Sequence, residues 1–414
     1  MTPDSSPALT SAQIPERVQG DDAILRGTNQ AGMREQNERL VLTLLRQHGS
    51  LAKTDIARIT GLSAQTVSVI MRALESDGLL LRGEPMRGRI GQPSVPMMLS
   101  PDGAFFFGLK IGRRSADLVL IDFLGKVRAT DRQTYRYPTP DAVVSFVAQR
   151  FPIMVASLEP MLRSRITGMG VAMPFQLWNW VQSIGAPQDE MDQWRNRDIQ
   201  AELSGLTGLT VQVQNDATAA CGAELVFGSG ERPKDFLYFY FGTFIGGGLV
   251  LNGHLFTGRS GNAAGVGPIQ VPGKDGRTRR LLDIASLCVL ADRMEAVGQS
   301  ADHFWEQHDT WHVTPDLLDA WITEASDALA HAILSAGALI EIEAVLIDGW
   351  MPVAVRAELA HRTSMSLHRL DLAGIEAPVI REGTVGADAR VMGAAAIPLT
   401  QRFLVEQNTH LRDL

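Results

Sequence analysis

A short run of polar side chains near the N-terminus has the residue types and the spacing of a DNA-reading helix. After Ser63, four apolar residues recur at the spacing of one helical face: Val67, Ile70, Met71 and Leu74. The opposite face presents a second set: Gln65, Thr66, Ser68, Val69 and Arg72. The polar members of this set suit base edges and phosphates in a major groove. No Asp or Glu falls on that face before Glu75, so repulsion from phosphate is low.

A second group of candidates is positively charged. Residues 79–99 are typical of two short extended segments around a tip rich in Gly and Arg. Arg82, Arg87 and Arg89 supply positive charge there, and the glycines between them let the backbone run close to a surface. Arginines on such a tip are suited to a narrow minor groove. We therefore expect a β-hairpin wing that contacts DNA.

Three short helices must position these side chains. The first begins near Met33 and ends near Gly49, and the second covers roughly residues 53–60, with Gly61 ending it. Ser63 is a good N-cap for the third helix. With the hairpin that follows, residues 33–100 are predicted to form a winged helix-turn-helix domain. Residues 1–32 mix Pro, Ser, Gly and charge without a period, and we expect a mobile tail.

The net charge of the whole chain, −8 over 414 residues, by itself argues against a nucleic-acid partner. The charge is, however, unevenly distributed along the chain. Residues 31–100 hold 9 basic and 6 acidic residues, whereas residues 101–414 hold 27 basic and 36 acidic ones. A polar helix with a few arginines is a solvated face in many proteins. Here the helix spacing, the turn, the wing and the local charge agree, so the expected partner is a double-stranded DNA operator. The modest positive charge predicts that a homodimer or higher homo-oligomer binds it.

The composition excludes several other classes of protein. Of the two cysteines, Cys221 and Cys288, neither has a second cysteine nearby, so neither a disulfide framework nor a thiolate zinc cluster is expected. No apolar stretch reaches the length of a membrane span, and the first thirty residues are polar. We expect a cytoplasmic protein without a membrane partner.

From Ala104 the sequence changes to alternating strands and helices, which is typical of an α/β fold. Residues 104–127 and 236–258 share one layout of strand, glycine-containing turn and strand. Such repetition favours a two-lobed, actin-like ATPase or sugar-kinase fold. We expect the first lobe to comprise residues 101–230 and 397–414, and the second lobe residues 231–396.

Four stretches carry a family resemblance. They are residues 168–174 (GMGVAMP), 211–224 (VQVQNDATAACGAE), 241–261 (FGTFIGGGLVLNGHLFTGRSG) and 385–399 (VGADARVMGAAAIPL). In these motifs the chain resembles the ROK family of repressors, open reading frames and kinases, specifically its members with an N-terminal winged helix. The resemblance implies that Asn215 and Asp216 contact a sugar, and that Asp216 would be the general base if the protein were a kinase. From the residues alone, an Asn-Asp pair before an Ala-rich segment is equally an N-cap, and both roles can coexist.

The resemblance also implies a phosphate-binding loop at Gly246 and Gly247, although a glycine run between strands is also simply a tight hairpin. The first phosphate loop departs from the family pattern, because Lys110–Ser115 stands where kinase members carry an Asp-rich glycine hairpin. The ammonium group of Lys110 cannot hold Mg²⁺. We therefore expect no kinase activity and no cofactor.

The sugar and zinc features of the family are depleted as well. Gly265 and Pro268 stand where the family has a sugar-binding Glu and a His, and Asp283 stands where it has a second sugar-contacting Glu. Residues 271–286 contain no Cys and no His, so no metal site is expected. A generic hexose should bind weakly to such a pocket, which would serve a different polyol or nothing at all.

These observations predict a DNA-binding transcriptional repressor that responds to a carbohydrate-like small molecule. Two alternatives stay open. One is an ATP-dependent sugar kinase with a DNA-binding appendage. The other is an effector-independent dimeric DNA-binding protein.

Overall fold

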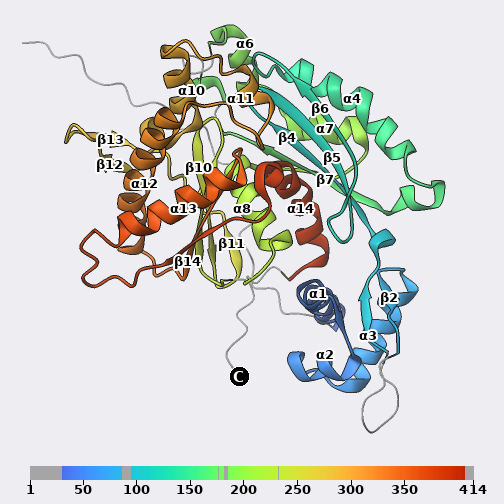
Figure 1. The fold of residues 1–414 in the computed structure, drawn as a ribbon. Coiled ribbons are helices and arrows are strands. Elements are labelled where there is room, and N and C mark those ends of the chain that lie inside the picture. The colour runs from blue at the N-terminus through green and yellow to red at the C-terminus, as the bar shows by residue number, and fades with distance from the viewer. Residues whose placement is uncertain (1–29, 86–94, 176, 181–184, 232, 406–414) are drawn as a thin grey trace, which may run out of the picture.

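The computed structural model describes residues 30–85, 95–175, 177–180, 185–231 and 233–405 (Figure 1). The predicted mobile tail lies outside the described residues as far as residue 29. Residues 30–32, which were assigned to that tail, instead begin the first helix, α1 (Gln30–His48).

The N-terminal unit is a winged helix-turn-helix. Helix α1 is followed by α2 (Lys53–Thr60) and α3 (Ala64–Ser76). Gly61 ends α2 in the left-handed conformation, and the Ser63 hydroxyl caps α3 by accepting the Thr66 amide at 3.1 Å. A small antiparallel sheet has the strand order β1 (Ser50–Leu51), β3 (Met97–Leu99), β2 (Leu80–Arg82). The predicted helices and both extended segments are therefore present.

The first lobe is built on a five-stranded sheet of order β6-β5-β4-β7-β8. Its strands are β4 (Phe105–Ile111), β5 (Ser115–Asp122), β6 (Val127–Thr134), β7 (Ile166–Met173) and β8 (Val211–Asn215). The α-helices on its chain segment are α4 (Pro140–Ala156), α6 (Gln188–Asp192) and α7 (Ile199–Thr207). Strands β4, β5 and β6 pair antiparallel, whereas β4, β7 and β8 run parallel.

The second lobe repeats this arrangement with the strand order β11-β10-β9-β14-β15. Its strands are β9 (Phe236–Phe241), β10 (Ile245–Leu251), β11 (His254–Phe256), β14 (Ala344–Gly349) and β15 (Val379–Glu382). The second lobe also contains α9 (Leu282–Ala285), α10 (Leu287–Ala296), α11 (Asp302–Glu306), α12 (Pro315–Gly337), α13 (Val353–Leu367) and the hairpin of β12 (Gln270–Pro272) and β13 (Thr278–Arg280). The two halves predicted from the sequence thus share one topology, an antiparallel three-strand meander extended by two parallel strands.

Two helices fill the space between the sheets (Figure 1): α8 (Asp216–Phe227) and α14 (Ala389–Phe403). Helix α8 packs on β10, where Gly248 leaves room for Cys221, and α14 packs on β4 and β7. Since α14 covers the first sheet from Ala389 onward, we propose that the first lobe resumes at Ala389 rather than at residue 397.

Backbone meets backbone around α14. A Cβ atom added to Gly393 would lie 1.8 Å from the Ala219 carbonyl oxygen, and one added to Gly170 would lie 1.9 Å from that of Ala394. On the neighbouring strand, a Cβ on Gly108 would lie 2.5 Å from the Val391 carbonyl oxygen. Only glycine fits at these places, so the position of α14 is fixed on both of its packed sides.

Within the part of the chain that the structure describes, no helix combines the length and the apolar character that crossing a membrane requires.

We predict that Gly393→Ala lowers the free energy of unfolding by about 3 kcal/mol, because the added methyl group forces α14 away from α8. Urea denaturation of the full chain measures this. The matched control is Gly205→Ala in α7, where nothing lies within 4 Å of the added atom. There, alanine should leave the stability unchanged or raise it by up to about 1 kcal/mol. Equal effects of the two substitutions would contradict the packing described here.

Candidate functional site

Helix α3 presents one face to the core and one to solvent. The four predicted apolar residues, Val67, Ile70, Met71 and Leu74, are buried. On the other face Gln65, Val69 and Arg72 are exposed, and Thr66 and Ser68 are half-buried. The Thr66 hydroxyl lies 2.8 Å from that of Ser63, and Arg72 Nε donates to the Ser68 carbonyl at 3.2 Å. The structure therefore brings all five residues predicted for this face, Gln65, Thr66, Ser68, Val69 and Arg72, onto one helix.

The predicted wing is only partly described. Arg82 lies on β2 and forms a bidentate pair with Glu75, with Nε–Oε1 at 2.6 Å and Nη2–Oε2 at 3.1 Å. The hydrogen bond from Arg82 lowers the pKa of Glu75, and the pairing neutralises the carboxylate that ends the exposed face of α3. Arg87 and Arg89 lie outside the described residues, so their contact with DNA stays a prediction.

Between the lobes, Asn215 and Asp216 stand at the start of α8. The Asn215 Oδ1 atom accepts the amides of Ala217 at 3.0 Å and Thr218 at 3.2 Å, which is the N-cap role. Asp216 Oδ1 accepts the Ala217 amide, and Asp216 Oδ2 lies 3.2 Å from Arg390 Nη1. Both side chains of that ion pair are 15% exposed. The capping role is thus present, and contact with a sugar remains a prediction.

Arg390 is the functional candidate that the sequence analysis missed. It lies in the first turn of α14, and its guanidinium carbon is 4.9 Å from the centre of the Tyr240 ring. Arg390 lies within the family motif at residues 385–399, but its pairing with Asp216 joins residues 174 positions apart. No local spacing signals such a contact. The pairing forms only once α14 has packed on α8.

Gly246 and Gly247 lie inside β10, opposite Tyr240 and Phe239 of β9. A Cβ on Gly246 would lie 2.6 Å from the Ala217 Cβ atom, and one on Gly247 would lie 2.7 Å from the Ala264 carbonyl oxygen. Close packing on α8 and on the loop at Ala264 therefore accounts for both glycines. Their contact with phosphate stays a prediction.

The segment Lys110–Ser115 carries a buried charge pair. The Lys110 ammonium group donates to Ser115 Oγ at 2.9 Å and forms an ion pair with Asp117, whose Oδ1 atom lies 3.2 Å from Arg132 Nε. Burial lowers the pKa of Lys110 to about 8, although the Asp117 charge acts in the opposite direction. Burial alone would raise the pKa of Asp117, but the Lys110 and Arg132 charges lower it overall. The ammonium group of Lys110 is thus used in the buried ion pair with Asp117.

Three arginines of the first lobe stack on aromatic rings of the second. The guanidinium carbon of Arg113 lies 3.4 Å from the centre of the Phe244 ring. Arg114 lies 4.9 Å from Trp305, and Arg132 lies 4.9 Å from Trp350. Each such contact contributes roughly 0.5–2 kcal/mol. Together these contacts hold the two lobes against each other beside the Lys110–Ser115 segment.

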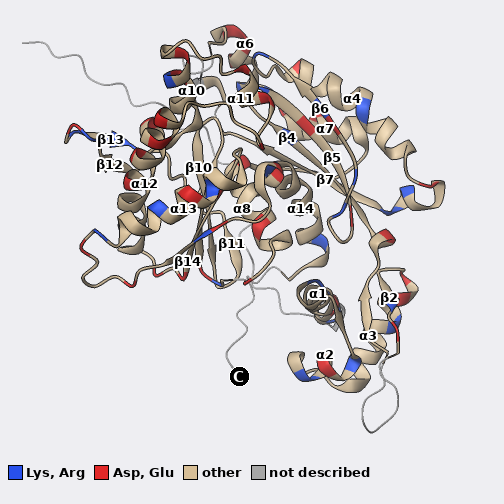
Figure 2. Ribbon diagram, viewed as in Figure 1, with Lys and Arg blue, Asp and Glu red and all other residues tan. Residues whose placement is uncertain are grey.

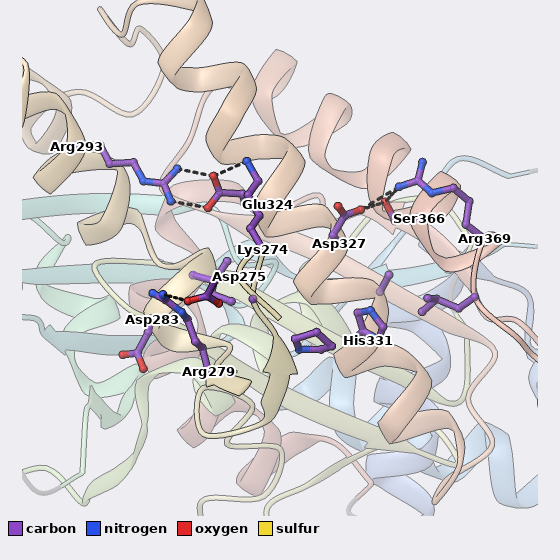
Figure 3. A pocket seen from close by; sticks show the side chains of 15 residues that line it. Lys274, Asp275, Arg279, Asp283, Arg293, Glu324, Asp327, His331, Ser366 and Arg369 are labelled. Atoms are coloured by element: carbon purple, nitrogen blue, oxygen red, sulfur yellow. Dashed lines mark hydrogen bonds and ion pairs between the residues drawn. The ribbon is translucent and has the colours of Figure 1, made fainter. Parts of the chain in front are cut away.

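Asp283 lies elsewhere, on a cavity of about 460 Å³ beneath the β12–β13 hairpin (Figure 3). It forms a bidentate pair with Arg280, with distances of 2.8 and 2.7 Å. Lys274 and Arg293 meet on Glu324, and Asp327 binds Ser366 and Arg369, as Figure 3 shows. Among the described residues that line this cavity are neither Asn215 nor Asp216. Asp283 therefore lines a cavity to which Asn215 and Asp216 do not contribute.

In the described ranges of the chain, no three His, Cys, Asp or Glu side chains are grouped so that they could hold a metal ion. Cys221 lies buried on α8, where burial raises the pKa of its thiol, and Cys288 lies on α10.

Comparison with known proteins agrees with this architecture. A model of the ROK family matches residues 106–401, and a model described as winged helix-turn-helix DNA-binding matches residues 34–80. The xylose repressor of Bacillus subtilis (strain 168) is 19% identical over 243 residues, which cover 59% of this chain and 62% of the repressor.

Solved structures show the same fold. A ROK family transcriptional regulator, described as a homolog of the E. coli MLC protein, superimposes with a TM-score of 0.63 at 20% identity, covering 90% of this chain and 96% of that one. A ROK family glucokinase from Streptomyces griseus, in complex with glucose and AMPPNP, superimposes with a TM-score of 0.54 at 21% identity, covering 71% and 99%. The predicted fold, a winged helix-turn-helix followed by a two-lobed sugar-kinase fold, is confirmed.

We predict that Lys110→Met lowers the free energy of unfolding by about 3 kcal/mol, because it leaves the Asp117 carboxylate buried without its ammonium partner. The double variant Lys110→Met/Asp117→Leu should recover most of this loss, since it removes both charges. Urea denaturation measures both. As a control, Arg58→Met breaks the exposed pair with Asp55, at 3.6 Å, and should cost less than about 1 kcal/mol. A single variant as stable as the parent would contradict the buried pairing.

Proposed function

The chain belongs to the ROK family, and from that premise we propose that it is a DNA-binding transcriptional repressor controlled by a carbohydrate-like effector. The observation that carries the proposal is the exposed face of α3, with Gln65, Val69 and Arg72, on a winged helix joined to a two-lobed body. The similarity to a xylose repressor supports a sugar-like effector. Acidic residues spread over the helices of the body (Figure 2), which keeps the body off the duplex while the winged helix binds it.

The DNA-binding unit is attached to the body through α1 and the turn after α3. The Val405 amide, just beyond α14, donates to Thr43 Oγ1 at 3.2 Å. Arg46 donates to the Phe123 carbonyl and lies 5.6 Å from the centre of that ring. Arg165 donates to the Gly78 carbonyl at 3.4 Å. A displacement of α14 would therefore reach α1 directly.

The other end of α14 carries Arg390, which holds Asp216. An effector whose hydroxyl groups bind Asp216 competes with Arg390 for the same carboxylate oxygen. This competition would release Arg390 and displace α14 together with the elements packed on it. The displacement would then reach α1 and α3. The size of the response is limited by the difference in effector affinity between the two arrangements.

We propose further that the protein catalyses no ATP-dependent phosphoryl transfer. A kinase needs a carboxylate free to accept the hydroxyl proton and a metal site beside the phosphates. Here Asp216 is paired with Arg390, and Lys110 with its Asp117 partner stands in the degenerate phosphate loop. The kinase alternative is favoured by one observation, the likeness of the body to a glucokinase. We propose as well that the protein acts as a homodimer in the cytoplasm, where an operator is accessible.

Arg72→Ala should weaken binding of the full chain to an operator obtained by selection from random duplexes, and should reduce the slope of log K against log salt by about 1, because one phosphate contact is lost. Fluorescence anisotropy at several salt concentrations measures both quantities. Arg369→Ala is the control, since Arg369 pairs with Asp327 in the second lobe. An unchanged slope in Arg72→Ala would rule out a phosphate contact of this residue.

A panel of sugars, sugar acids and sugar phosphates should contain a compound that raises the melting temperature of the full chain by mass action. Asp216→Asn should abolish that shift, whereas Asp371→Asn, in an exposed loop, should keep it. In a coupled assay with ATP and Mg²⁺ the same compounds should give no turnover. Turnover that depends on Asp216 would overturn the proposal and favour the kinase, and the absence of any shift would favour a DNA-binding protein without an effector.

A further inference from the structure

Val69 is an apolar side chain on the polar face of α3. It is 47% exposed, whereas Val67 and Ile70 beside it are buried. A β-branched residue is a poor choice for an exposed helix position, because it loses side-chain freedom in the helix and leaves apolar surface in water. The packing and the helix propensity of the free protein therefore do not explain why valine stands here.

The position of Val69 in the face is informative. Residues three and four apart lie above one another on a helix, so Val69 stands between Gln65, one turn before it, and Arg72, almost one turn after it. All three side chains are exposed. The Ser63 cap fixes where α3 begins, and the buried face fixes how the helix is rotated. Val69 is thus held at the centre of the surface that would enter a major groove.

The major groove contains one apolar group that an aliphatic side chain can recognise, the C5-methyl group of thymine. Cytosine lacks this group, and the other base edges present hydrogen-bonding atoms. We propose that Val69 reads the C5-methyl group of a thymine at the centre of the α3 footprint. The inference rests on the proposed DNA-binding function and adds a determinant of sequence: the operator half-site contains an obligatory T·A pair facing Val69.

The contacts on either side are consistent with such a reading. Gln65 lies in the first turn of α3, the part of a recognition helix that reaches base edges in this class of domain. Arg72 lies further along, with Nε already donating to the Ser68 carbonyl, and its length suits a phosphate at the groove edge. The apolar contact of Val69 then falls between a base contact and a backbone contact.

The test uses the full chain and an operator selected from random duplexes. Selection should enrich a thymine at one fixed position of each half-site. Replacing that thymine by deoxyuridine in both half-sites removes only the two methyl groups, and should weaken binding of the dimer about fifteen-fold, or about four-fold for each buried methyl group. Val69→Ala should weaken binding to the thymine operator by a similar factor. In Val69→Ala the deoxyuridine replacement should have no further effect.

Three controls make the coupling specific. Val69→Ile keeps an aliphatic side chain and should keep the sensitivity to deoxyuridine. Val353→Ala, at an exposed valine (66%) that begins α13 in the second lobe, should bind the thymine and deoxyuridine operators as the parent does. Deoxyuridine at a thymine outside the α3 footprint should cost the same in the parent and in Val69→Ala.

The outcomes separate this inference from the function on which it rests. If selection succeeds but deoxyuridine weakens the parent and Val69→Ala equally, or if no thymine is enriched, Val69 does not read a methyl group and the inference is wrong, while DNA recognition stands. If the chain enriches no sequence at all, the proposed function fails and this inference fails with it.

Discussion

The contact on which the rest of the structure depends is the close approach of α14 to α8 and to the first sheet. At Gly393 and Gly170 backbone lies where any side chain would stand, so α14 cannot slide without separating the two layers. This packing brings Arg390 to Asp216 at one end of the helix, and Val405 to Thr43 at the other. A single helix therefore joins the ion pair at Asp216 to the DNA-binding unit.

Where the two lobes meet, cationic side chains outnumber anionic ones, in a chain whose net charge is −8. Lys110 and Arg132 share Asp117, Arg390 holds Asp216, and the arginines of the β4–β5 turn stack on rings of the opposite lobe. Aromatic faces stabilise buried guanidinium groups without adding carboxylates. Arg113 and Arg114, in the turn between β4 and β5, thus supply contacts between the lobes.

Elements defined by local spacing were predictable from the sequence. The apolar residues of α3, the Ser63 cap and Gly61 determine helix positions through contacts within one or two turns. The repeated hairpins at 104–127 and 236–258 predict two similar lobes. Pairings between distant segments were not predictable, Arg390 with Asp216 above all. The glycines of β10 suggested a phosphate loop, whereas packing on Ala217 explains Gly246. Asp283 pairs with Arg280, three residues earlier, and the sugar contact that the resemblance implies for it stays a prediction.

The attachment of the winged helix to the body bears on how a signal could pass. Its hydrogen bonds run from single side chains or amides to carbonyl and hydroxyl oxygens, as with Arg46, Arg165 and Val405, and each contributes about 1–3 kcal/mol. Residues of both parts, such as Leu45 of α1 and Phe403 of α14, also share one buried apolar cluster. Coupling free energies between sites are typically 1–3 kcal/mol, so an effector would reorient the unit by changing a few polar contacts while this apolar contact is kept. Around Gly393, by contrast, backbone packs directly on backbone, with no room for a side chain. A signal generated at Asp216 would therefore leave α14 intact and be released where the helix meets α1.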